Sequence, residues 1–189
     1  TNVAYLQVGV PEYRISQMVK NGGNILDAYG VVNVISPSGL PMRGIVGISP
    51  DPIMFVALNC LNVRDSRDFY AQLGFVEQEY PFCRPNKGMG QFEPPQPKNS
   101  IYMAPSKNSV GVLLLQTDRK KKTIKPNPAF RSLNIVYTPS VDVTDGDGDA
   151  GASDSLKVVD PNGTGVSFQP YGSFEKEELL TRVAVKEEA

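Results

Sequence analysis

Short apolar runs alternate with turn residues along the chain, and the first 48 residues already show their order. The run at residues 5–10 predicts a strand, and apolar residues at helical spacing predict a helix over about residues 13–20. Asn-Gly-Gly at residues 21–23 ends this helix. A β-rich run at residues 31–35 then leads through a turn into another strand. The segment therefore has the predicted order β-α-β-β.

The turn after this run has a counterpart near the end of the chain. Residues 36–43 are Ser-Pro-Ser-Gly-Leu-Pro-Met-Arg, and residues 160–167 are Asp-Pro-Asn-Gly-Thr-Gly-Val-Ser. In both segments proline presets one backbone dihedral and glycine supplies a positive φ. Each turn also lies between two β-rich runs, so each predicts a β-hairpin.

The strand and helix pattern restarts at residue 54. A mostly apolar strand at residues 54–63 precedes a short helix, for which Asp65 or Ser66 is the expected N-cap and Gly74 the expected end. Further strands are predicted at residues 75–82, 89–92, 100–103 and 110–116.

A third unit is expected over residues 133–171, beginning with a strand at residues 133–137. Its connection at residues 140–155 is rich in Asp and Gly and has no helical periodicity, whereas the first unit has a helix there. The tail from residue 173 has the pattern of a capped amphipathic helix.

The composition excludes several classes of chemistry. The 189 residues include no histidine and no tryptophan, and the only cysteines are Cys60 and Cys83. Nucleophilic systems that use imidazole as their base, and metal sites that need His ligands, are therefore excluded. The 19 basic and 20 acidic residues create no overall field that would attract nucleic acid. No apolar run approaches the roughly 20 residues that a membrane-spanning helix needs.

Three further features have simple interpretations. Counted from Asp145 in the Asp/Gly run at residues 145–151, the positions where an EF-hand loop requires Gly and Glu are Ala150 and Leu156, which favours a solvated acidic loop. The basic run at residues 119–122 has no interleaved aromatic residue, which favours a solvated turn, although it could dock an acidic partner. Both cysteines are expected to be core thiols.

One segment resembles a known family. Residues 63–75, Val-Arg-Asp-Ser-Arg-Asp-Phe-Tyr-Ala-Gln-Leu-Gly-Phe, resemble the opening module of glyoxalase I and its relatives, the vicinal oxygen chelate superfamily. In that family a strand ends in Val-x-Asp, the helix carries Phe-Tyr, and Leu-Gly-Phe follows. The turn at residues 160–163 resembles the family's Asp-Pro-Asp-Gly hairpin. The resemblance implies an α+β fold of paired βαβββ modules with curved mixed sheets.

The same resemblance implies the domain boundaries. Residues 1–50 would be a partial module, similar to the second half of an upstream domain, residues 51–172 a complete glyoxalase-like domain, and residues 173–189 a C-terminal helix. This order resembles the tandem-domain glyoxalase I proteins of plants, which suggests a chloroplast location. An unpaired module would expose half a core, so we expect residues 1–48 to pack on an upstream module, a second copy or another subunit.

Family enzymes hold a divalent metal with one ligand from each of four strands, drawn from His, Gln and Glu. The resemblance places these positions on Leu58, Leu114, Asn134 and Ser167, and in the N-terminal half-domain on about Tyr5 and Arg43. Two leucines, an amide and a hydroxyl supply no negative charge for such an ion. We therefore expect no metal, no other cofactor and no catalytic residues at these positions.

Three functions follow from this combination. The first is a non-catalytic glyoxalase-fold protein that acts as a binding or structural subunit of a larger assembly, with a protein partner or a second copy. The second is a glyoxalase I-like enzyme, a lactoylglutathione lyase, which works through a different site. The third is a metal-free binder of small molecules, similar to the bleomycin-resistance branch of the family.

Overall fold

The computed structural model describes most of the chain, in two compact units. The first unit comprises residues 1–131 with the turn at residues 161–163, and the second comprises residues 132–160 and 164–189. The described residues within them are 1–26, 31–46, 53–81, 96–107, 109–118, 120–137 and 156–170.

The first unit opens with a strand, a helix and three strands. These elements are β1 (Val3–Val10), α1 (Glu12–Lys20), β2 (Asn24–Ile25), β3 (Val32–Ile35) and β4 (Pro41–Val46). The predicted order is confirmed, and the short strand β2 is added to it. As expected, α1 ends at the Asn-Gly-Gly segment, where Asn21 is the C-cap and Gly22 has a φ of 86°.

The same succession follows in the second half of this unit. Its elements are β5 (Ile53–Cys60), α2 (Val63–Gln72), β6 (Val76–Glu77), β7 (Ser100–Ala104) and β8 (Gly111–Gln116). Gly74, with a φ of 84°, follows the end of α2 as predicted. Within the described residues, the strand expected at residues 75–82 is reduced to the two residues of β6.

The expected N-cap of α2 is wrong by one turn. The cap is Asn62, whose side-chain oxygen accepts a hydrogen bond from the Arg64 N–H at 3.1 Å. Asp65 and Ser66 lie inside the first turn instead, where the Ser66 hydroxyl donates to the carbonyl of Asn62 at 3.2 Å. Because Asn62 sits at the end of an apolar run, its capping role was hidden by the strand prediction.

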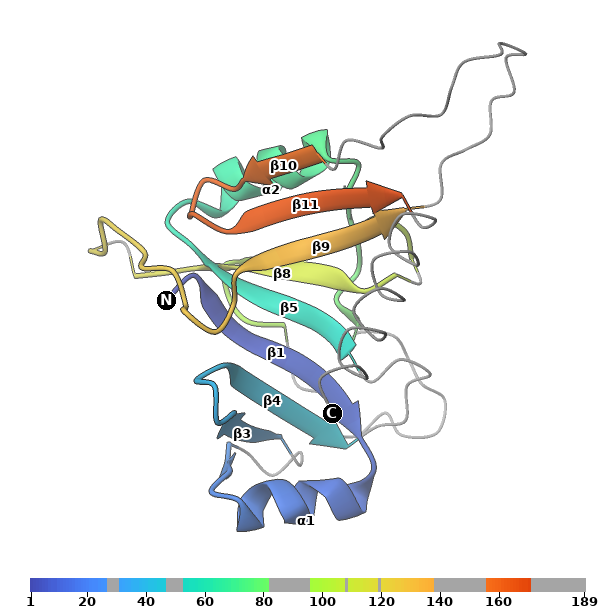
Figure 1. Ribbon diagram of the computed structural model, residues 1–189, viewed down its shortest axis with the longest axis vertical. Coiled ribbons are helices and arrows are strands. Elements are labelled where there is room, and N and C mark those ends of the chain that lie inside the picture. Colours follow the sequence, from blue (N-terminus) through green and yellow to red (C-terminus); the bar gives the residue numbers. More distant parts are fainter. Residues whose placement is uncertain are drawn as a thin grey trace, which may run out of the picture. The chain divides into compact units, whose positions relative to one another are not determined.

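The ten elements form one mixed, eight-stranded sheet with two helices. The strand order is β2-β3-β4-β1-β5-β8-β7-β6. In the first half β1 is parallel to β4, and in the second β5 is parallel to β8. The halves join where β1 and β5 pair antiparallel, so each half has the same strand order outward from this seam (Figure 1). We call the halves the first repeat (residues 3–46) and the second repeat (residues 53–116).

This grouping differs from the one that we predicted. The sequence placed residues 1–50 apart and paired residues 54–116 with residues 133–171, whereas β1 shares a long antiparallel ladder with β5. The apolar edge of the N-terminal segment is thus covered within the chain. The two central strands are largely buried, which is the environment that their apolar composition favours.

The two faces of this sheet carry different side chains. On one, which we call the cluster face, Tyr5, Phe55 and Leu113 belong to a single buried cluster. On the other, the helix face, Ile15 and Met18 of α1 come closest to Gly44 on β4. Helix α2 contacts β7 and β8, and its buried Tyr70 is not part of the cluster, so we place it on the helix face as well.

The second unit contains a three-stranded sheet among its described residues. Its strands are β9 (Ser132–Tyr137), β10 (Leu156–Val159) and β11 (Gly165–Pro170), in the order β10-β11-β9. Strand β11 is antiparallel to β10 and parallel to β9. The strands β3, β4 and β1 of the first repeat have the same arrangement, so the second unit repeats part of that topology.

Both predicted hairpin turns are confirmed. Gly39, between β3 and β4, has a φ of 88°, and Gly163, between β10 and β11, has a φ of 83°. Several predictions lie outside the described residues, namely the strand at 89–92, the acidic loop at 145–151, the C-terminal helix and Cys83. Cys60 is fully buried, which confirms that it is a core thiol.

Candidate functional site

The four positions aligned with the family's metal ligands form two pairs, one in each unit. Leu58 and Leu114 lie opposite each other on the parallel strands β5 and β8, and both are fully buried. Asn134 and Ser167 lie opposite each other on β9 and β11, and the Ser167 hydroxyl donates to Oδ1 of Asn134 at 2.5 Å. The first pair belongs to the first unit and the second pair to the second unit.

Leu58 and Leu114 point away from the cluster face. Successive side chains of a strand alternate between faces, and the neighbours Ala57 and Leu113 belong to the buried cluster around Tyr5. Strand pairing agrees, because Tyr5 lies opposite Ala57 across the seam. Leu58 and Leu114 therefore lie on the face opposite Tyr5. The residues on the cluster face at this level of the strands are their neighbours Ala57 and Leu113.

The two aligned positions of the first repeat do come together. The guanidinium carbon of Arg43 lies 3.7 Å from the centre of the Tyr5 ring, in a close cation–π contact. Arg43 is half-buried, and Tyr5 is 6 % exposed. Strand register puts both side chains on the cluster face, since Arg43 pairs with Gln7, two residues beyond Tyr5.

Two amide side chains fix the orientation of Arg43. Its Nε donates a hydrogen bond to Oδ1 of Asn33 at 3.0 Å. The buried Gln7 donates from Nε2 to the backbone carbonyl of Arg43, also at 3.0 Å. Among the residues that the structure describes, the two terminal nitrogens of the guanidinium have no hydrogen-bond or ion-pair partner. Arg43 is thus held at one edge and available at the other.

Tyr5 brings a second unused donor to this place. Its hydroxyl is buried and has no hydrogen-bond partner in the described part of the chain. The ring packs edge-on against Phe55, with centroids 6.2 Å apart. Burial raises the pKa of Tyr5 above its usual value of 10.0, and the nearby positive charge of Arg43 opposes that rise. The phenol is therefore a neutral donor at physiological pH.

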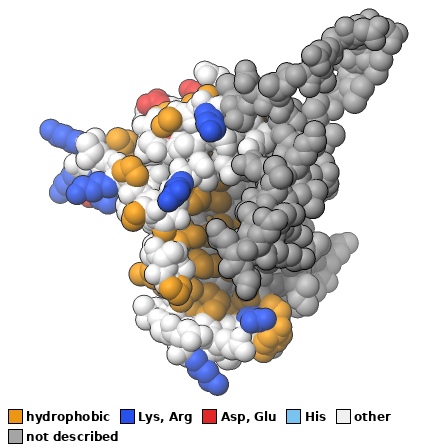
Figure 2. Space-filling model, viewed as in Figure 1, with side chains coloured by type: hydrophobic (Ala, Val, Ile, Leu, Met, Phe, Trp, Pro, Cys, Tyr) orange, Lys and Arg blue, Asp and Glu red, His pale blue; other side chains and the backbone are white. Residues whose placement is uncertain are grey.

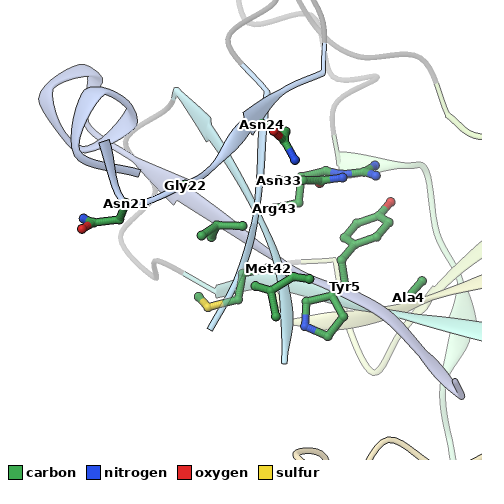
Figure 3. Close-up of a pocket in the computed structure, with 11 residues that line it drawn as sticks. Ala4, Tyr5, Asn21, Gly22, Asn24, Asn33, Met42 and Arg43 are labelled. Atoms are coloured by element: carbon green, nitrogen blue, oxygen red, sulfur yellow. The ribbon is translucent and has the colours of Figure 1, made fainter. Parts of the chain in front are cut away.

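A cavity of about 390 Å³ lies at this end of the first repeat. It is bounded by the start of β1 and β4, the end of β3 and the turn after α1 (Figure 3). Asn24, Asn33, Arg43 and Tyr5 gather on one side of the strands, while Asn21 and Met42 lie on the other. The lining residues are Ala4, Tyr5, Asn21, Gly22, Asn24, Asn33, Val34, Ile35, Pro41, Met42 and Arg43.

The lining of the cavity limits the chemistry that it can perform. It includes one cation, amides, a phenol and apolar groups, and none of the lining residues is acidic. Within the described ranges of the chain, no three His, Cys, Asp or Glu side chains come together in a way that could hold a metal ion. The described cavity offers hydrogen-bond donors and a positive charge, which suit an anionic ligand.

A second charged feature lies away from the cavity. Lys120, Lys121 and Lys122 are exposed in the turn after β8, where the N–H of Lys121 donates to the carbonyl of Asp118 at 2.9 Å. Lys and Arg side chains gather over this turn in Figure 2. The prediction of a solvated turn is confirmed for these three lysines.

Comparison with known proteins adds no identification. No protein-family model matches the chain, and no curated protein matches it. Among the described helices, neither is long and apolar enough to cross a membrane.

Sequence reasoning found Tyr5 and Arg43 only as displaced ligand positions, and it missed Gln7 and Asn33. A usable signal was present, because each of these amides interrupts a short apolar strand. A polar residue inside an otherwise apolar strand must find a partner when the strand is buried. Their common partner, Arg43, could not be named without the register of the sheet.

Proposed function

We propose that this protein is a non-catalytic binding protein, built on glyoxalase-like paired modules, that holds its ligand without a metal ion. The cavity beside Arg43 and Tyr5 is the observation that carries this proposal. Its volume of about 390 Å³ lies within the range of small-molecule sites, roughly 300–1,000 Å³. Its orientated, half-buried cation, whose terminal nitrogens have no partner among the described residues, is a feature of a binding site rather than of a packed core.

The arrangement of the strands supports the choice of scaffold. Two successive β-α-β-β-β segments with the same strand order meet edge to edge, with one helix in each. Paired βαβββ modules are what the sequence resemblance implies. The resemblance rests on residues 63–75 and on the turn at residues 160–163.

The chemistry of the described lining favours binding over proton transfer. A glyoxalase-type reaction needs an electrophile and a base that accepts a proton near neutral pH. The Arg43 guanidinium has hydrogen-bond donors and no acceptor, and burial raises the pKa of Tyr5 so that the phenol keeps its proton. Neither group can act as the base.

The test combines elemental analysis with a turnover assay. We expect substoichiometric zinc, nickel, manganese and iron in the purified chain. We also expect no conversion of the hemithioacetal of methylglyoxal and glutathione, with or without added metal. About one metal per chain together with metal-dependent turnover would refute the proposal.

A second role, as a subunit of a larger assembly, is favoured by exposed apolar side chains in the first repeat. Tyr13 on α1, Ile25 on β2 and Ile35 on β3 are 61 %, 65 % and 71 % exposed. Hydrophobic side chains gather near α1 at the lower edge of Figure 2. Register places Ile25 on the helix face and Ile35 on the cluster face, so both faces at this outer edge of the sheet expose apolar side chains that a protein contact would cover. Light scattering of the isolated chain tests this role: a second copy gives a dimer mass that the variant Ile25→Ser with Ile35→Ser reduces to a monomer.

A further inference from the structure

Arg43 differs from Arg67, an exposed arginine of the same unit, in what neutralises its charge. Arg67 on α2 forms an ion pair with Asp68 at 2.6 Å, and both side chains are exposed. Arg43 is half-buried and has a neutral amide and an aromatic ring as its described partners. A partly desolvated cation without an anion is costly, so the site favours a ligand that supplies the anion.

The donors that remain at the site have a defined arrangement. Two hydrogen bonds hold Arg43: its Nε donates to Asn33, and the side chain of Gln7 donates to its backbone carbonyl. The two terminal nitrogens of the guanidinium remain as a planar fork of donors. The ring of Tyr5 lies beneath the guanidinium (Figure 3). The Tyr5 hydroxyl is buried, so the fork of Arg43 is the donor group that a ligand reaches, and none of the residues lining the cavity is acidic.

We propose that this cavity binds a small monocarboxylate with an apolar body, whose carboxylate is held by the guanidinium of Arg43. This inference rests on the proposed binding function and names the class of its ligand. A carboxylate matches the planar fork of an arginine with two parallel hydrogen bonds. The apolar body fits beside Ile35 and Pro41, which line the cavity and lie on the same face of the strands as Arg43.

The charge of the site favours a carboxylate over a phosphate. Arg43 is the one cation among the lining residues, so it balances a single negative charge. A phosphate near neutral pH carries between one and two charges and is usually held by several cations or by a helix N-terminus. The cavity offers neither, because it meets α1 at its C-terminal turn, at Asn21 and Gly22.

Titrations of the ¹⁵N-labelled chain with acetate, butyrate and benzoate test the proposal, with butyramide, benzamide and inorganic phosphate as matched probes. We expect saturable amide shifts at the start of β1 and along β3 and β4, with affinity rising from acetate to benzoate. The neutral amides should bind at least about tenfold more weakly, since they lack the charge that a guanidinium recognises.

Three variants assign the binding to the named side chains. Arg43→Gln should lower benzoate affinity at least about tenfold, and Arg43→Lys should restore part of it, because a lysine keeps the charge and loses the fork. Tyr5→Phe keeps the ring beneath the guanidinium, so benzoate affinity should stay within about twofold while the melting temperature stays the same or rises. Arg67→Gln is the matched control, and it should leave benzoate affinity unchanged.

The outcomes separate this inference from the function on which it rests. Equal affinity for benzoate and benzamide, preference for phosphate, or full benzoate binding by Arg43→Gln would each overturn the monocarboxylate assignment. Absence of saturable shifts with all three acids would overturn it as well. None of these results alters the metal and turnover tests, so the non-catalytic function stands or fails separately.

Discussion

The two repeats of the first unit share one topology but fill part of the same sheet face with different chemistry. In the first repeat the cluster face carries Gln7, Asn33 and Arg43, which are tied to one another by hydrogen bonds. In the second repeat the corresponding strands present Phe55 and Leu113, both fully buried. The scaffold therefore tolerates either a polar network or an apolar core at equivalent places.

This difference separates what holds the fold from what serves a ligand. The fully buried apolar side chains of the second repeat stabilise the fold, because they remove apolar surface from water. The first repeat has a buried hydroxyl without a partner and a cation without an anion among the described residues. Such features cost stability, and they are expected where a protein reserves groups for binding.

The largest effect is expected from making the second repeat polar. Leu113→Asn should destabilise the chain by about 4 kcal/mol, because it leaves a cavity and buries an amide without a partner. Gln7→Leu, the opposite change in the first repeat, should cost only about 1 kcal/mol, the size of one net hydrogen bond. Urea unfolding of both variants measures the contrast. Equal losses would show that the two halves of the face are equivalent.

A smaller contrast is expected between one glycine of each repeat. A Cβ on Gly111 would lie 2.4 Å from the backbone carbonyl oxygen of Met103, which cannot move without shifting β7. A Cβ on Gly44 would lie 2.6 Å from the sulfur of Met18, a flexible side chain that can rotate. Gly111→Ala should therefore cost about 3 kcal/mol and Gly44→Ala about 1 kcal/mol. Thermal unfolding that ranks them in the reverse order would contradict this account.

Tyr5→Phe should increase the stability of the chain, whereas the changes above decrease it. The change removes a buried hydroxyl that has no partner in the described structure, and it keeps the ring beside Arg43 and Phe55. We expect a gain of about 1 kcal/mol in the free energy of unfolding, with little change in benzoate affinity. A loss of stability would indicate that the hydroxyl has a structural partner.

The smallest expected effect is a pH dependence that only alkaline conditions reveal. Burial raises the pKa of Tyr5 in the folded chain above its usual value of 10.0. The unfolded chain then loses this proton first, so the contribution of the phenol is fully present below pH 10 and is lost as the pH rises through the folded pKa. The stability difference between the wild-type chain and Tyr5→Phe should be constant below pH 10 and widen above it. A difference that stays constant to higher pH would contradict burial of the phenol.

The sequence by itself determined the local elements of this protein. Hydrophobic spacing located both helices and most strands to within a few residues. The turns at Gly39 and Gly163 were predicted correctly, because glycine is the residue that most readily adopts the positive φ that such turns need. The cap of α2 was misplaced, since Asn62 at the end of an apolar run could belong to either element. Helices, turns and caps depend on residues that are close in sequence, so the sequence alone is enough to predict them.

Only the tertiary structure decided which segments share a sheet and which face each side chain occupies. Pairing of β1 with β5 joined the N-terminal segment to the second repeat, and the strand register turned Leu58 and Leu114 away from the cluster face. It also brought Tyr5 next to Arg43, 38 positions later in the chain. A shift of one residue in register exchanges the two faces of a strand. Pairing between strands that are far apart in sequence depends on which whole faces of the sheet become buried. A local sequence pattern does not carry that information.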